Sequence, residues 1–113
     1  MKNKINILGQ DYQIVVDNTG NNPNLEDVNG YMEPYSKKIV VDGNICNKSN
    51  TKQAENLEMY VRHVYRHEIM HAFFEESGLS YKFTKDDEDF LVDWIAKQFP
   101  KMKKIFEELG VAD

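Results

Sequence analysis

The first third of the chain alternates apolar and polar residues with a period of two, which is typical of half-buried β-strands. Gly, Pro and Asn-rich stretches interrupt the alternation and mark turns. The clearest strand contains Ile39, Val40 and Val41 in a row and ends at Gly43. The pattern predicts four strands, over residues 4–8, 12–16, 28–32 and 37–42.

The middle of the chain changes to apolar spacings of three and four, the period of an amphipathic helix. Residues 51–77 contain neither Gly nor Pro. Asn50 with Gln53 resembles a capping box at the start of this helix, and Gly78 suits its end. The apolar stripe consists of Leu57, Tyr60, Val61, Val64, Met70 and Phe74. We therefore expect one long helix here.

Two further helices are expected towards the C-terminus. The first covers residues 86–99, where Pro100 should interrupt it, and the second covers residues 101–109 and ends at Gly110. Strands come first and helices follow, without repeats or a linker, so the fold class is α+β with a small antiparallel or mixed sheet. We expect one domain, residues 1–113.

Charge and composition narrow the possible partners. The net charge of −5 argues against binding to nucleic acid or to anionic membranes, which attract basic surfaces. No apolar run reaches the roughly 18 residues of a membrane span, and the N-terminus does not read as a signal peptide. Cys46 is the only cysteine, so we expect an inert thiol and a cytoplasmic protein.

The long helix carries a metal-binding motif. His67, Glu68 and His71 fit the pattern H-E-x-x-H. Residues four apart share one helix face, so the two imidazoles could bind one zinc ion. Glu68 is turned about 100° from His67 and could accept a proton from a water on the metal.

A third ligand is needed, because catalytic zinc sites usually have three protein ligands and a water. His63 and His71 are eight residues apart, roughly 12 Å along a helix, so His63 cannot join both other histidines on one ion. We expect His63 to be a flanking or surface residue whose removal changes little. The remaining candidates are acidic residues of the second helix: Asp89, with Glu88 as the alternative, and Asp93 as a hydrogen-bonding support. The face of that helix that carries Asp89, Asp93 and Lys97 could instead be exposed to solvent.

These motifs resemble a known family. The segments around His67–His71 and Asp89–Asp93 look like a minimal gluzincin, a thermolysin-like zinc peptidase, and are similar to short metallopeptidase-like proteins of phages and mobile elements. The resemblance implies a minimal zincin fold, with Glu68 as the base. It also implies that position 89, Asp here in place of the family's Glu, completes the metal site supported by Asp93.

The function predicted from these features is zinc-dependent hydrolysis of a protein or peptide. We expect the substrate to extend along an edge strand, for which we choose Lys38–Asp42. Tyr81 is a candidate hydrogen-bond donor to the reacting carbonyl, although a packing role is favoured for it. One alternative is a zinc-binding module that recognises a partner without turnover. Another is a helical interaction protein in which the motif is a coincidence.

Overall fold

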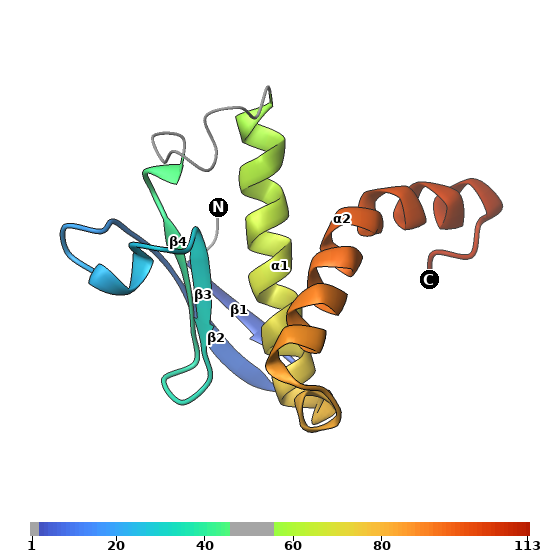
Figure 1. Cartoon of the computed structure of the whole chain (residues 1–113). Coiled ribbons are helices and arrows are strands. Elements are labelled where there is room, and N and C mark those ends of the chain that lie inside the picture. Colours follow the sequence, from blue (N-terminus) through green and yellow to red (C-terminus); the bar gives the residue numbers. More distant parts are fainter. Residues whose placement is uncertain (1–2, 46–55) are drawn as a thin grey trace.

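The computed structural model describes residues 3–45 and 56–113. A four-stranded sheet comes first and two long helices follow it (Figure 1). The strands are β1 (Lys4–Ile7), β2 (Gln10–Asp17), β3 (Gly30–Glu33) and β4 (Lys38–Asp42). The helices are α1 (Leu57–Ser77) and α2 (Lys85–Leu109), with short 3-10 turns at Pro23–Leu25 and Leu79–Lys82. The α+β prediction is confirmed.

The sheet is mixed, with strand order β1-β2-β4-β3. β2 and β4 run parallel, with Val15 opposite Val40, whereas β1 and β3 pair antiparallel with their neighbours. β4 is therefore an interior strand, and β3 is an edge strand. The prediction that Lys38–Asp42 offers an edge to a substrate is wrong, because both of its sides are already paired.

Helix α1 packs across one face of the sheet. Its N-cap is Asn56, whose side chain accepts a hydrogen bond from the Met59 amide, and it ends at Gly78 in the left-handed conformation. The expected Asn50–Gln53 capping box lies outside the described residues, as does Cys46. The core joins sheet and helix through buried side chains: Ile7, Tyr12, Ile39, Val41, Ile45, Val64 and Ala72.

A polar cluster fixes the C-terminal end of α1 against the sheet. The fully buried Tyr12 donates its hydroxyl to Glu76 Oε2 at 2.5 Å, and Lys37 Nζ donates to the same oxygen at 2.7 Å. Lys37 lies 5.7 Å from the centre of the Tyr12 ring. The hydrogen bonds from Lys37 and Tyr12 lower the pKa of Glu76, so this carboxylate stays ionised. At the other end of α1, Asn29 Nδ2 donates to the Tyr60 hydroxyl at 2.7 Å.

Helix α2 is one helix where two were predicted. Pro100 lies inside it, and the distal half bends away from α1 (Figure 1). A proline removes the N–H that would bond the carbonyl four residues earlier, here that of Ala96. Arg66 of α1 donates its Nε–H to this carbonyl at 2.8 Å instead. The acceptor is thereby satisfied, and the helix continues to Leu109.

Among residues 3–45 and 56–113, neither helix combines the length and apolar content that crossing a membrane requires.

Candidate metal centre

The H-E-x-x-H motif lies in the middle of α1 and faces a cleft of about 600 Å³. The cleft runs between α1, the first turns of α2 and the edge strand β3. His67, Glu68 and His71 line it from α1, and Glu88, Asp89 and Asp93 line it from α2. The structure therefore brings the candidate metal ligands, the candidate base and their candidate supports to one place.

The two motif histidines point their Nε2 atoms at one carboxylate oxygen. Asp89 Oδ1 lies 3.1 Å from His67 Nε2 and 3.2 Å from His71 Nε2. The ring centroids of the two imidazoles are 4.9 Å apart. Asp89 can approach both rings because the first turns of α2 pack beside the middle of α1.

The Nδ1 atoms of the same histidines each contact a different carboxylate. His67 Nδ1 lies 3.0 Å from Asp93 Oδ1, and His71 Nδ1 lies 2.6 Å from Glu88 Oε2. An ionised carboxylate can only accept, so a neutral ring that donates its Nδ1–H to Asp93 or Glu88 keeps a lone pair on Nε2, which suits a cation placed between the two rings and Asp89. Two nitrogen lone pairs and a carboxylate oxygen facing one point form a set of donors that could hold a metal ion.

Glu68 is the buried member of the site, with 7% of its surface exposed. Its carboxylate, His67 and His71 offer ligand atoms that lie within 4.8 Å of one another. Burial raises the pKa of the Glu68 carboxyl and Asp89 adds to this rise, while His67 and His71 act in the opposite direction. A carboxylate in this position is poised to take up a proton.

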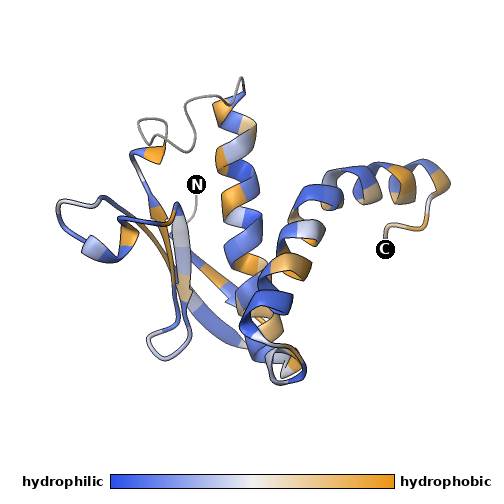
Figure 2. Cartoon of the chain, viewed as in Figure 1, coloured by the Kyte–Doolittle hydropathy of each residue, from blue (hydrophilic) through white to orange (hydrophobic). Residues whose placement is uncertain are grey.

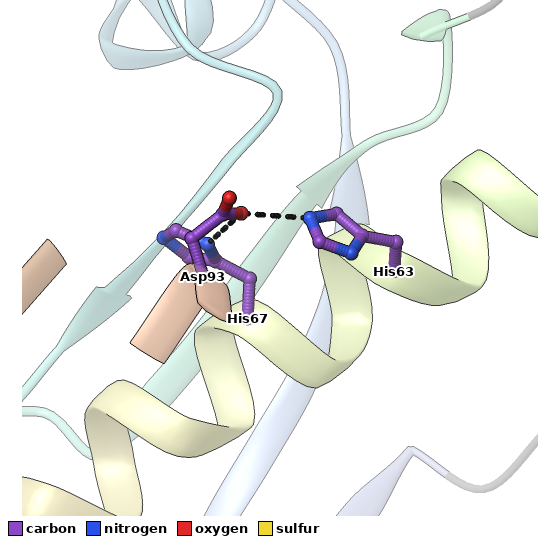
Figure 3. A group of neighbouring side chains, drawn as sticks. All are labelled: His63, His67 and Asp93. Atoms are coloured by element: carbon purple, nitrogen blue, oxygen red, sulfur yellow. Dashed lines mark hydrogen bonds and ion pairs between the residues drawn. The ribbon is translucent and has the colours of Figure 1, made fainter. Parts of the chain in front are cut away.

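His63 has a partner that the sequence did not reveal. Its Nε2 lies 2.7 Å from Asp93 Oδ1, the oxygen that also contacts His67 (Figure 3). Burial acts to raise the pKa of Asp93, but the hydrogen bonds from His67 and His63 outweigh it and the pKa is lowered. His63, His67 and Asp93 also form a group with metal-ligand spacing. The side chain of His63 is only 17% exposed, so it flanks the motif without being a surface residue.

The helix face of α2 that carries Asp89 and Asp93 is turned partly to the cleft and partly to solvent. Val92 and Ala96 are buried beside it. Phe90 and Trp94, which a simple amphipathic pattern would bury, are 74% and 49% exposed. The interpretation of this face as purely exposed to solvent is therefore wrong for Asp93, which contacts two histidines.

The edge strand β3 comes close to Glu68 because Gly30 has no side chain. A Cβ at position 30 would lie 2.9 Å from the Val40 carbonyl oxygen and 3.4 Å from Glu68 Cγ. The backbone of β3 can thus line the cleft directly. Tyr81, for which the sequence favours a packing role over that of a hydrogen-bond donor, is 90% exposed and is not among the residues that line the cleft.

Comparisons of the chain with protein-family models, curated proteins and solved structures give no match. The resemblance to gluzincins is supported only by the cluster of groups that could bind a metal. What the site does must therefore be argued from its own residues.

Proposed function

We propose that the protein is a zinc-dependent peptidase. The observation that carries this proposal is the pair of Nε2 atoms facing Asp89 Oδ1, each on a ring whose Nδ1 is held by a second carboxylate. Histidine ligands of zinc usually donate their other ring N–H to such a carboxylate, which fixes the ring and raises its basicity.

The spacing of the donors suits zinc. Bonds of about 2.0–2.1 Å in tetrahedral geometry separate two ligand atoms by roughly 3.4 Å. The 3.1 and 3.2 Å between Asp89 Oδ1 and the two nitrogens are close to that value. His67, His71 and Asp89 would hold the ion, and Asp93 and Glu88 would orient the histidines. A zinc ion held here supplies Lewis acidity, which lowers the pKa of a water towards about 7.

Glu68 would act as the general base. Its carboxylate would accept the proton of the attacking water and pass it to the amine that leaves when the peptide bond breaks. Its burial shields it from bulk water. Glu68 belongs to the same helix as both histidines, so the helix itself fixes its position relative to them.

A peptide substrate would extend along β3. This strand is an edge of the sheet, and residues 29–32 line the cleft opposite Glu68 and the histidines. An extended chain can pair main chain to main chain with such an edge, largely independently of its sequence. The approach at Gly30 would bring the bound peptide close to Glu68.

The alternative is a zinc-binding module that recognises a partner without turnover. Asp89 favours it, because its side chain is 62% exposed and is one methylene shorter than Glu. A short, exposed ligand would leave the metal more open to solvent than a longer, buried carboxylate would.

The test is metal analysis of untagged protein, followed by incubation with a broad peptide library. The peptidase proposal expects one zinc per chain and cleavage that a chelator stops and added zinc restores. One zinc without any cleavage would support the binding module. Purified protein that contains no zinc and binds none when zinc is added would contradict both the peptidase and the binding module.

The third ligand can be identified by a pair of matched substitutions. Asp89→Asn should weaken zinc binding by more than the roughly 10–100-fold expected when a supporting residue is lost. Glu88→Gln and Asp93→Asn should stay within that range, because each removes only a partner of an Nδ1 atom. The measurement is competition with a chromophoric chelator. If Glu88→Gln strips the metal and Asp89→Asn does not, Glu88 is the ligand.

A further inference from the structure

The distal arm of α2, residues 99–109, carries an apolar face that no other described element covers. It begins beside Pro100 and projects from the body of the molecule, with apolar residues recurring along it (Figure 2). Ile105 is 61% exposed, Leu109 is 75% exposed, and Val111 just beyond the arm is 56% exposed. None of these residues lines the cleft, so this surface is separate from the proposed peptidase site.

The apolar side chains of the arm form one stripe. At 100° per residue they project within about 120° of one another, which is the width of a helix-packing face. Ile105 lies near the middle of the arm's length. The stripe consists of Phe99, Met102, Ile105, Phe106 and Leu109.

The charged residues beside the stripe are arranged in a regular way. Lys103 and Glu107 lie along one flank, and Lys101 and Glu108 lie along the opposite flank. On each flank the lysine is nearer the start of the arm and the glutamate nearer its end. Lys103 and Glu107 are 3.8 Å apart within the chain but remain more than half exposed, so they are available to a partner.

This arrangement is complementary to itself when two arms run antiparallel. In an antiparallel helix pair each flank faces the same flank of the other copy in reverse order, so Lys103 meets Glu107 and Lys101 meets Glu108. In a parallel pair the lysines would meet lysines and the glutamates would meet glutamates. The same antiparallel register, centred near Ile105, sets Met102 against Leu109.

We propose that the distal arm pairs antiparallel with the arm of a second copy of this chain. The interface is isologous, with Ile105 and Phe106 at its two-fold axis. The arm is about 16 Å long at 1.5 Å per residue, so the contact is small and the dimer reversible. Neither the zinc nor the cleft takes part in it.

The experiment is sedimentation equilibrium across a concentration series of the full chain, without and with zinc. The mass should rise from one to two chains with concentration, independently of zinc. Phe106→Asp should remove the dimer, whereas Tyr35→Asp, at a turn residue that is 94% exposed, should leave it unchanged.

Charge reversal tests whether the flank charges contribute to the pairing. Lys101→Glu with Lys103→Glu should weaken self-association at least about tenfold, and so should Glu107→Lys with Glu108→Lys, because every flank contact becomes repulsive. An equimolar mixture of the two double variants should restore dimers. Circular dichroism confirms that each variant is folded. A wild-type chain that stays monomeric would overturn the proposal. So would an equimolar mixture that stays monomeric when each double variant alone is also monomeric.

Discussion

Replacing His71 with alanine should abolish stoichiometric zinc binding. The substitution removes one of the two imidazoles that face Asp89, together with the nitrogen that lies 2.6 Å from Glu88. Loss of a ligand should exceed the roughly 10–100-fold that a supporting residue costs. Because an ion that binds only the folded state stabilises it, the variant should also lose any zinc-dependent rise in melting temperature. Zinc titration and thermal denaturation measure the two effects.

His63→Ala is the matched control for this experiment. It removes an imidazole from the same helix face, one turn before the motif. The sequence predicted almost no effect. Because His63 contacts Asp93, which in turn supports His67, we expect a loss smaller than the roughly 10–100-fold expected for Asp93→Asn. Full zinc affinity in His71→Ala would rule out the proposed site of His67, His71 and Asp89. A larger loss in His63→Ala than in His71→Ala would favour a site built on His63, His67 and Asp93.

Replacing Glu68 with glutamine should separate binding from chemistry. The amide keeps the size of the side chain but cannot accept a proton, so peptide hydrolysis should fall by about 10²–10⁴-fold, the usual contribution of a general base. Zinc binding should remain, because Glu68 is not one of the proposed ligands. The fold should be at least as stable, because glutamine spares the free energy of burying a charge at this 7% exposed position.

Glu58→Gln makes the same chemical change on the same helix and serves as the control. Glu58 is exposed and pairs only with Arg62 in the described structure, so hydrolysis should be unaffected. The measurement is the initial rate on a peptide that the wild type cleaves. Equal rates in Glu68→Gln and the wild type would exclude Glu68 as the base. Loss of zinc from Glu68→Gln would instead identify Glu68 as a ligand.

The elements of the fold could be predicted from the sequence because their periodicities are simple. Alternation located the four strands, and spacings of three and four located α1, which begins at Leu57 after the Asn56 cap. The order of strands in the sheet was not predictable in the same way. It depends on β2 and β4 pairing in parallel, a contact between distant segments that leaves no local pattern. The wrong choice of edge strand followed from this.

The site was predicted as far as one helix could define it. His67, Glu68 and His71 lie on α1, so their relative positions follow from helix geometry. The positions of Glu88, Asp89 and Asp93 depend on how α2 packs against α1, which the sequence does not specify. The pairing of His63 with Asp93 was missed for the same reason, although the i, i+4 spacing of His63 and His67 placed both on one face.

The hydrogen bond from Arg66 to the Ala96 carbonyl makes the residue at position 66 depend on the residue at position 100. An N–H at position 100 would donate to the same carbonyl, which would then no longer depend on Arg66 for a hydrogen bond. Loss of Arg66 alone would leave the carbonyl unsatisfied beside a proline. Loss of Arg66 is therefore costly while position 100 is proline and more tolerable once it is not, so related sequences that lack Arg66 should also lack Pro100. Covariation of these two positions would therefore trace the packing of α2 against α1, which carries Asp89 to the histidines.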